Sequence, residues 1–365
     1  MPIYMDIHVI PGVKAQDVAE AHRKDLFHAE EYGCKCMTYW IDEERENVFC
    51  LIEAPDKETV NAMHNRAHGL IANKIIEVDS SVVESFLGRI YDPENATITS
   101  DGLKVFSESS FRVLLIVWIS DPILLKYRYG NEKAIELLTQ TNNLVRKNAS
   151  VYKGREVEHD KPGFIISFDS AAQAIACALE IQHNLDAEFL DKTIFRMSLH
   201  AGEPVDTSEL LFGDALRFAD FLCGISPAGQ LSITPEVRDL VANQQFDLIK
   251  GVMILSPRDK QFLELLFSTL DKKWQDADLN LDDYCRAMAM SKSQLYRKTI
   301  ELSGMSPNVL LREFRLHKAK ELLKKQLSSI AQITFDCGFT SPSYFTKCFK
   351  KKYGLLPMAY IDLLQ

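Results

Sequence analysis

One pattern near the end of the chain occurs twice and constrains the fold more than any other sequence feature. Each copy is a short apolar helix, a tight turn, and a second helix that begins at a serine. The first copy starts at Leu281, turns at Ala289, is capped by Ser291 and ends at Gly304; the second starts at Ile330, and its turn and cap are Gly338 and Ser341. Serine satisfies free backbone N–H groups at a helix start, and glycine adopts the left-handed turn. The spacing therefore predicts two helix–turn–helix units.

The stretch that contains both units is helical throughout and differs in charge from the rest of the chain. The segment Pro307–Lys325 is predicted to join the units as an amphipathic helix, with one apolar face formed by Val309, Leu316, Ala319 and Leu323. Residues 256–365 carry 18 Lys and Arg against 12 Asp and Glu, whereas the whole chain carries 42 against 51. The preceding residues therefore hold 24 against 39, a net charge of −15. A basic end on an acidic body is typical of a nucleic-acid-binding module.

The residues of this segment resemble the AraC family of transcription regulators from Leu279 to Tyr360. The resemblance is carried by SKSQLYRKTIELSGMSP, by RLHKAKELL in the connecting helix and by IAQITFDCGFTSPSYFTKCFKKKYGLLPMAY. It implies an all-α double helix–turn–helix domain over residues 256–365. It also implies that both second helices enter adjacent major-groove segments of a double-stranded DNA operator.

The positions that face DNA follow from helix geometry, because base-reading side chains lie on the first two turns at i, i+3, i+4 spacing. The predicted base readers are Ser293, Gln294, Arg297, Ser343, Tyr344 and Lys347. Arg297 suits guanine and Gln294 suits adenine. The predicted phosphate contacts are Lys298, Lys350, Lys351 and Lys352. A lysine run alone is more often a solvated face, but here it ends a predicted recognition helix.

Residues 111–252 are predicted to form an α+β domain that opens with the buried strand RVLLIVWIS. This segment resembles the catalytic domain of class III nucleotide cyclases from Phe111 to Val241. The shared phrases are GREVEH, GFIISFDSAAQAIACALEIQ, LHAGEPV, LFGDALRFADFLC and PAGQLSIT. The resemblance implies a cyclase-like fold that binds a ligand, pairs with a second copy, or does both.

The catalytic residues that the cyclase resemblance implies are missing. Two carboxylates would hold two divalent metals, but Trp118 and Pro162 stand at those positions. The asparagine and arginine of a later helix are replaced by Arg217 and Phe221. The nearby carboxylates, Asp121 and Asp160, are offset, and a one-residue shift in a strand turns a side chain to the opposite face. We therefore predict that the chain is not an enzyme. The alternative is an active nucleotide cyclase fused to a DNA-binding module.

Residues 1–90 are predicted to alternate strands and helices in the order Ile3–Ile10, Ala15–Tyr32, Cys36–Ile41, Val48–Ala54, Lys57–Ile71 and Lys74–Val78. The polar segment Tyr91–Gly102 contains Pro and Gly, so residues 91–110 are predicted to be a linker. The first ninety residues resemble a family of small ferredoxin-like proteins of which some bind nickel. The shared stretches are MPIYMDIHVIPG, AEAHRKD, TYW, FCLIEAPDKETV and HNRAHGLIANKIIEV.

This domain also concentrates metal-binding residue types, because five of the nine histidines lie in its first 68 residues. His64 and His68 are four residues apart on one predicted helix, so their rings can converge on one ion. Imidazole with thiolate or carboxylate suits nickel, zinc or copper. The predicted metal ligands are His8, His22, Cys50, His64 and His68, with Asp6, Cys34, Cys36 and Glu53 in the same stretch. The alternative is that His64 borders an apolar helix face and His68 is solvated.

These segments together predict a fold of two α+β domains, ferredoxin-like and cyclase-like, followed by the all-α domain. The predicted function is sequence-specific transcription control that responds to nickel, another divalent transition metal or a small ligand. We expect a cytoplasmic homodimer, because the eight cysteines form no regular framework and no signal peptide or membrane span is evident. A cyclase domain pairs across its active site, which makes dimerisation a natural residual role for the middle segment.

The absence of carboxylates at Trp118 and Pro162 predicts that the protein has no cyclase activity. The purified protein should form no cyclic nucleotide from ATP or GTP with Mg²⁺ or Mn²⁺, because nothing at those positions can hold the two ions against a triphosphate. A pyrophosphate-release assay measures this. Turnover that is abolished by a substitution in the middle domain would establish the enzyme alternative.

Overall fold

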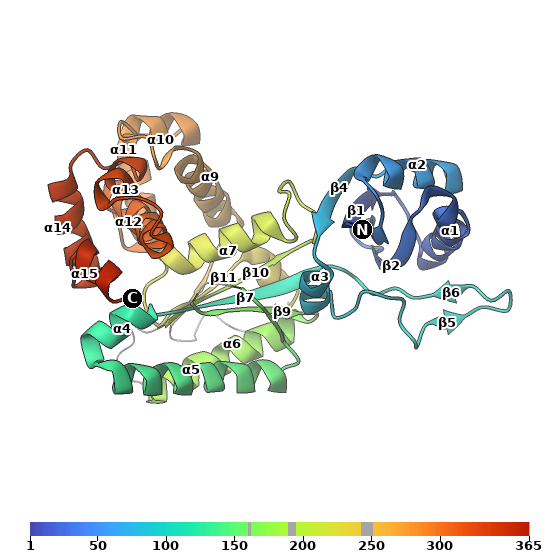
Figure 1. Ribbon diagram of the computed structural model, residues 1–365, viewed down its shortest axis with the longest axis horizontal. Helices are drawn as coiled ribbons and strands as arrows, with labels where there is room; N and C mark the ends of the chain where they lie inside the picture. Colours follow the sequence, from blue (N-terminus) through green and yellow to red (C-terminus); the bar gives the residue numbers. More distant parts are fainter. Residues whose placement is uncertain (160–161, 189–194, 242–250, 365) are drawn as a thin grey trace.

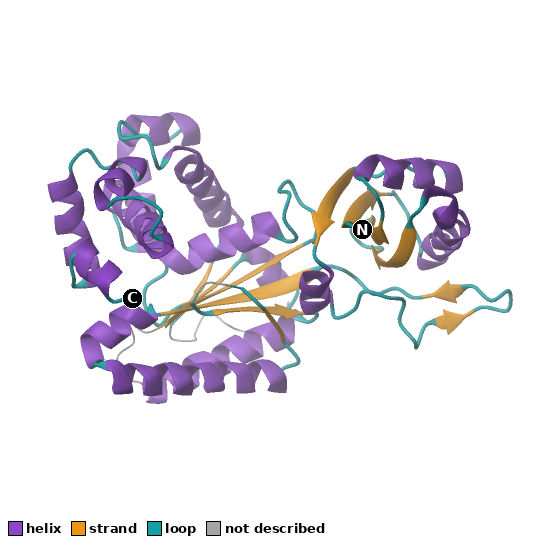
Figure 2. Cartoon of the chain, in the orientation of Figure 1, coloured by secondary structure: helices purple, strands orange, loops and turns teal. Residues whose placement is uncertain are grey.

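The computed structural model describes residues 1–159, 162–188, 195–241 and 251–364. Three units follow one another along the chain, and the first and last lie at opposite ends of the molecule (Figure 1). The described strands are confined to the first two units and the connection between them, whereas the last unit is entirely helical (Figure 2). The predicted fold class is therefore confirmed. Asp160 lies outside the described residues.

The first unit is a four-stranded antiparallel sheet in the order β2-β3-β1-β4. Its strands are β1 (Ile3–Val9), β2 (Lys35–Asp42), β3 (Asn47–Glu53) and β4 (Lys74–Val78). Its helices are α1 (Ala15–His28), the short 3₁₀ helix η1 (Ala29–Tyr32) and α2 (Lys57–Ala67). Strand side chains alternate between the two faces of a sheet. Tyr4 thus packs with Val18 and Val60 under α1 and α2, while Met5 lies in a separate core on the other face.

A helix that the sequence analysis did not predict, α3 (Ser80–Leu87), joins the first unit to the second. The Asp79 side chain caps it by accepting hydrogen bonds from the backbone N–H groups of Ser81 and Val82. Val83, Phe86 and Leu87 on this helix share one buried core with side chains from both neighbouring sheets. The two units therefore pack against each other and are not connected only by a flexible linker.

The predicted linker at 91–110 has structure of its own. It forms a hairpin of two short strands, β5 (Thr97–Ile98) and β6 (Lys104–Val105). Leu103 and Phe106 of this arm are buried in the core of the first unit, where the Phe106 ring stacks on Tyr39 at 4.1 Å between centroids. The apolar residues that follow Gly102 indicate burial, and the prediction of a linker did not take them into account.

The middle unit is a six-stranded sheet in the order β12-β11-β10-β7-β9-β8. Its strands are β7 (Arg112–Ile119), β8 (Arg155–Val157), β9 (Phe164–Phe168), β10 (Phe195–Gly202), β11 (Leu231–Ile233) and β12 (Val252–Ile254). Its helices are α4 (Pro122–Tyr129), α5 (Asn131–Val151), α6 (Ala171–Glu188), α7 (Gly213–Ile225) and α8 (Pro235–Asp239). Helices α5 and α6 cover one face of the sheet, and α7 lies on the other (Figure 1).

The last unit contains seven described helices: α9 (Pro257–Lys273), α10 (Leu281–Met288), α11 (Lys292–Ser303), α12 (Pro307–Lys325), α13 (Ile330–Asp336), α14 (Pro342–Tyr353) and α15 (Pro357–Asp362). The predicted caps are present: Ser291 and Gln294 form a capping box, and Ser341 accepts a hydrogen bond from the N–H of Tyr344. In the first turn Ala289 adopts the left-handed conformation, at φ +50°, that Gly338 adopts in the second.

The connecting helix α12 corrects one detail of the predicted pattern. Leu316, Ala319 and Leu323 are buried as expected, but Val309 is only partly buried, and the neighbouring leucines Leu310 and Leu311 fill the core instead. The apolar face shifts because both helix–turn–helix units pack against this helix from different sides. Among the described residues no helix has the length and apolar character needed to cross a membrane.

Candidate metal centre and DNA-binding surface

Four buried side chains of the first unit converge on one point beneath α1 and α2. Asp6 and His8 share a face of β1 because they are two residues apart, and Cys50 on β3 pairs with Asp6 in the strand register. His64 reaches them from α2. One ligand atom from each of the four lies within 4.8 Å of the others. This is the spacing of side chains that can share a single metal ion.

His64 bridges two carboxylates in this cluster. Its Nε2 donates to Asp6 Oδ2 at 2.9 Å and its Nδ1 donates to Asp25 Oδ1 at 3.1 Å. Burial by itself lowers the pKa of His64, but the charge of Asp6 and the hydrogen bonds to both carboxylates outweigh it and raise the pKa to about 10. Burial raises the pKa of Asp25, but the hydrogen bonds from His64 and His68 outweigh it and hold this pKa below its usual range. Without a metal, an imidazolium thus neutralises buried carboxylates.

A second, overlapping group consists of Asp25, His64 and His68. His68 Nε2 lies 3.1 Å from Asp25 Oδ1 and 3.1 Å from His64 Nδ1. His64 lies in the last turn of α2 and His68 directly follows the helix, and the two rings converge as the four-residue spacing predicted. His64 belongs to both groups, so an ion in either one would compete with its proton.

His8 is the side chain that best indicates a metal. It is buried, yet neither of its ring nitrogens has a hydrogen-bond partner among the described residues, although Nε2 lies 3.5 Å from Asp6 Oδ1. An unpaired buried polar atom is costly, and a metal ligand is one role that explains it. Burial also raises the pKa of the Cys50 thiol, which nearby carboxylates raise further, so the thiolate needs a cation beside it. Imidazole, thiolate and carboxylate together fit a divalent transition metal.

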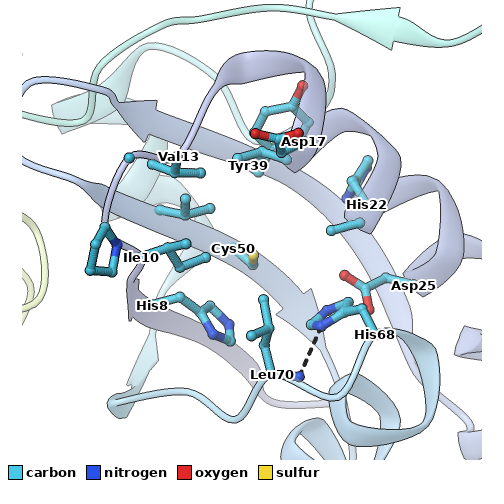
Figure 3. Close-up of a pocket in the computed structure, with 15 residues that line it drawn as sticks. His8, Ile10, Val13, Asp17, His22, Asp25, Tyr39, Cys50, His68 and Leu70 are labelled. Atoms are coloured by element: carbon cyan, nitrogen blue, oxygen red, sulfur yellow. Dashed lines mark hydrogen bonds and ion pairs between the residues drawn. The ribbon is translucent and has the colours of Figure 1, made fainter.

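A pocket of about 240 Å³ opens beside the cluster (Figure 3). His8, Cys50, Asp25 and His68 line one part of it, and the rest of the wall is mainly apolar, with Ile10, Val13, Val18, Val48 and Leu70. The pocket gives an ion or a small ligand a route to the cluster.

The structure thus brings together His8, Cys50, His64 and His68 of the predicted ligands. His22 lines the same pocket but lies outside both groups, with its Nε2 3.6 Å from Asp92 of the arm and its ring 5.1 Å from Tyr39. Cys34, Cys36 and Glu53 are in neither group. Asp25 was not predicted, because it meets His64 only through the packing of α1 against α2.

The predicted DNA-contact residues are mostly free to meet DNA. The exposed ones are Ser293, Gln294, Arg297, Ser343, Tyr344, Lys347, Lys350, Lys351 and Lys352, of which Lys352 forms an ion pair with Glu313. The residues between them, Leu295, Phe345 and Phe349, are fully buried and form the core of the two units. Gln294 uses its side-chain oxygen in the capping box at Ser291. Lys298 is partly buried and forms ion pairs with Asp259 and Glu301, so it is less available to phosphates than predicted.

The positions that the cyclase resemblance assigns to catalysis carry structural contacts here. Trp118 donates a hydrogen bond from its ring nitrogen to Asp220 at 2.6 Å. Arg217 pairs with Asp214, and Phe221 is buried and stacks on Phe267. Among the described residues, therefore, these positions offer no carboxylate pair for two metals.

Comparisons with known proteins match segments near both ends of the chain. Residues 284–362 match the family model described as a helix-turn-helix domain, and residues 4–78 match the one described as nickel responsive protein SCO4226-like. The HTH-type transcriptional regulator MtrA of Neisseria gonorrhoeae is 33% identical over 103 residues, which cover 28% of this chain and 34% of that regulator. The chain spans between 8% and 37% of the lengths of the first curated relatives that it matches.

Solved structures are similar to parts of the chain. SCO4226 from Streptomyces coelicolor A3(2) is 31% identical, covers 21% of this chain and 94% of its own, and has a TM-score of 0.20. The adenylate/guanylate cyclase/hydrolase from Silicibacter pomeroyi is 23% identical, covers 37% and 82%, and has a TM-score of 0.32. The sequence matches confirm the predicted resemblances of the two ends: the chain carries an AraC-type helix–turn–helix segment and a segment similar to nickel-responsive proteins.

Substitutions at two exposed residues should distinguish a contact to a base from a contact to phosphate. Arg297→Ala should relax preference at one base pair and cost ~1–3 kcal/mol on a specific site. Lys351→Ala should weaken binding to all sequences about equally and lower the salt slope by about one. Binding isotherms on specific and random duplexes at several salt concentrations measure both. Unchanged specificity in Arg297→Ala would show that this residue does not read a base.

The His64 cluster predicts how the stability of the metal-free protein varies with pH. The folded pKa of about 10 lies above the usual value of 6.5, so this stabilisation is fully present below pH 6.5 and is lost as pH rises toward 10. Thermal unfolding of the wild type and of His64→Gln should therefore differ most near pH 6.5 and converge near pH 10. A gap that widens with pH would mean that His64 is not held as the imidazolium.

Proposed function

We propose that this chain is a DNA-binding transcription regulator whose operator affinity depends on a divalent transition metal, with nickel as the first candidate. The observation that carries the proposal is the buried His8 without a hydrogen-bond partner, inside a cluster with Asp6, Cys50 and His64. That cluster lies in the segment similar to nickel-responsive proteins, and the same chain carries two helix–turn–helix units. A sensor and a DNA-binding surface in one polypeptide are the minimum that such regulation needs.

The residues of the cluster would hold the ion in place of a proton. A bound metal would supply the positive charge that the His64 imidazolium supplies in its absence. Asp6 and Asp25 remain as carboxylates in either state, while His64 and Cys50 must each lose a proton to act as ligands. Metal affinity should therefore rise with pH across the neutral range.

Movement of the ligands can reach the middle unit through β1. Asp6 and His8 belong to the cluster, while Met5 before them and Ile7 between them pack in the core that α3 shares with the middle sheet. Contacts from α1 also reach the arm that leads into β7, through the ion pair between Arg23 and Asp101. A regulator needs a coupling of ~1–3 kcal/mol between its two sites, or 5–150-fold in affinity. The ligand must bind one arrangement better than the other.

A small organic effector in the pocket of about 240 Å³ is the second candidate, because much of its wall is apolar. We also propose a homodimer on double-stranded DNA, since two symmetry-related subunits would read two half-sites. A dimer that used the face around Trp118 would have to displace α12, since His317 of that helix stacks on the Trp118 ring.

Replacing His64 of α2 and His68, the residue that follows this helix, tests the metal site. The variant His64→Ala/His68→Ala should lose nickel, measured by elemental analysis of the purified protein, and should lose any metal-dependent change in DNA affinity. Cys50→Ala leaves the ion pair between His64 and Asp6 in place and should weaken nickel binding without unfolding the domain. His28→Ala, on α1 but outside both groups, serves as the control and should behave as wild type.

Each result of this experiment has a distinct meaning. Unaltered nickel content in the double variant would remove the proposed site. Lost metal with retained effector-dependent DNA binding would place the sensor elsewhere, and the adjacent pocket would be examined first. Wild-type protein that binds nickel but shows the same DNA affinity with and without it would contradict the regulatory role.

A further inference from the structure

The end of the middle sheet where a cyclase would hold its metals is covered by the DNA-binding unit of the same chain. Trp118, at the end of β7, stacks on His317 of α12 with ring centroids 4.9 Å apart and planes 10° from parallel. Asp121 follows three residues later and is the N-cap of α4, accepting a hydrogen bond from the Ile123 N–H at 3.0 Å. This carboxylate is the centre of the contact.

Three donors from the last unit converge on one oxygen of Asp121. Lys320 and Lys324, one turn apart on α12, lie 3.0 and 2.8 Å from Oδ2, and the Tyr360 hydroxyl donates to the same oxygen at 2.9 Å. The Asp121 side chain is only 1% exposed. Burial alone would raise the pKa of Asp121, but the two lysines outweigh it and hold the pKa at about 2. A buried carboxylate of this kind is stable only while its cations stay in place.

Apolar packing anchors each helix–turn–helix unit separately to the middle unit. Phe218, Phe221 and Leu222 of α7 share a core with α9 and with the first helix–turn–helix unit. Ile123 and Leu124 of α4 pack against the core of the second unit, which contains Phe345 and Phe349 of α14. One anchor on each unit restrains how α11 and α14 are placed relative to each other.

We propose that this surface is a docking site for the DNA-binding unit and that the Asp121 contact acts as a latch which restrains DNA binding. The proposal rests on the DNA-binding part of the proposed function. The recognition residues stay exposed in the docked state, so the restraint does not come from covering them. It acts by fixing the orientation of the two recognition helices, which must fit adjacent groove segments. It also holds the basic unit against an acidic body, whose field opposes the approach of DNA.

The substitution Asp121→Asn tests the latch with little change in shape. Asparagine still caps α4, but Lys320 and Lys324 then lie beside each other without the charge of Asp121, so the contact should open. Asp239→Asn is the matched control, because it makes the same change in net charge on the same unit at an exposed residue that pairs with its neighbour Arg238. Both variants keep the metal cluster and all recognition residues.

Two readouts on the full-length protein separate docking from its effect on DNA. Hydrogen exchange measures protection in peptides of α12 and α4. Fluorescence anisotropy measures affinity for a random-sequence 30-base-pair duplex at one fixed salt concentration. We expect faster exchange in both helices and at least about fivefold tighter DNA binding for Asp121→Asn, with neither change in Asp239→Asn.

The outcomes that overturn the proposal are distinct from a failure of the proposed function. Unchanged exchange in Asp121→Asn would show that Asp121 does not hold the units together. Faster exchange with unchanged DNA affinity would show that the Asp121 contact does not restrain DNA binding. An equal gain in DNA affinity for Asp239→Asn would show the same. If the wild type and both variants all failed to bind duplex DNA, the result would contradict the proposed function and, with it, the proposed restraint on DNA binding.

Discussion

Side chains on β1 alternate between two buried environments, and the rest of the molecule is arranged around that alternation. Asp6 and His8 face the helices and form the ionic cluster, whereas Met5 faces a core that runs through α3 into the middle sheet. A strand with both faces buried cannot shift its register without moving every side chain to the wrong face. The ligand cluster and the boundary between units are therefore parts of one packed element.

The cluster itself is a group of charges that must balance. Burying a carboxylate is unfavourable unless it is paired and hydrogen-bonded, and Asp6 and Asp25 both depend on His64. A bound ion has to supply at least the positive charge that the imidazolium supplies. This requirement favours a divalent cation that prefers nitrogen and sulfur ligands. The same logic applies to Asp121 at the far end of the middle unit, where two lysines supply the balancing charge. Buried charges at two distant points of the molecule are thus each stable only while their partners stay in place.

The features that the sequence predicts correctly are those whose signal is local. The serine caps and the left-handed turns of the last unit are set by residues within one helical turn, so both helix–turn–helix units were predictable. The convergence of His64 and His68 was predictable for the same reason. Helix α3 was missed because eight residues are too few for a clear period, and the 91–110 arm was missed because its polar tip hides the buried Leu103 and Phe106.

The contacts that were missed are those made by chain segments far apart in sequence. Asp25 meets His64 only when α1 packs on α2, and Lys298 meets Asp259 only when α11 packs near α9. Asp121 was considered as a displaced catalytic carboxylate, since only the folded chain shows that α12 and α15 supply its partners. No periodicity or spacing in the sequence encodes such pairings, because each depends on how whole helices dock.

We propose that the metal cluster and the DNA-binding unit are coupled through the packed boundaries between the units. Hydrogen exchange of the wild-type protein with and without one equivalent of nickel tests it most directly. We expect altered protection not only in α1 and α2 but also in α3 and in α12, beyond the middle sheet. Nickel binding with changes in protection confined to residues 1–78 would contradict this coupling, because the ion would then have no effect on the other units.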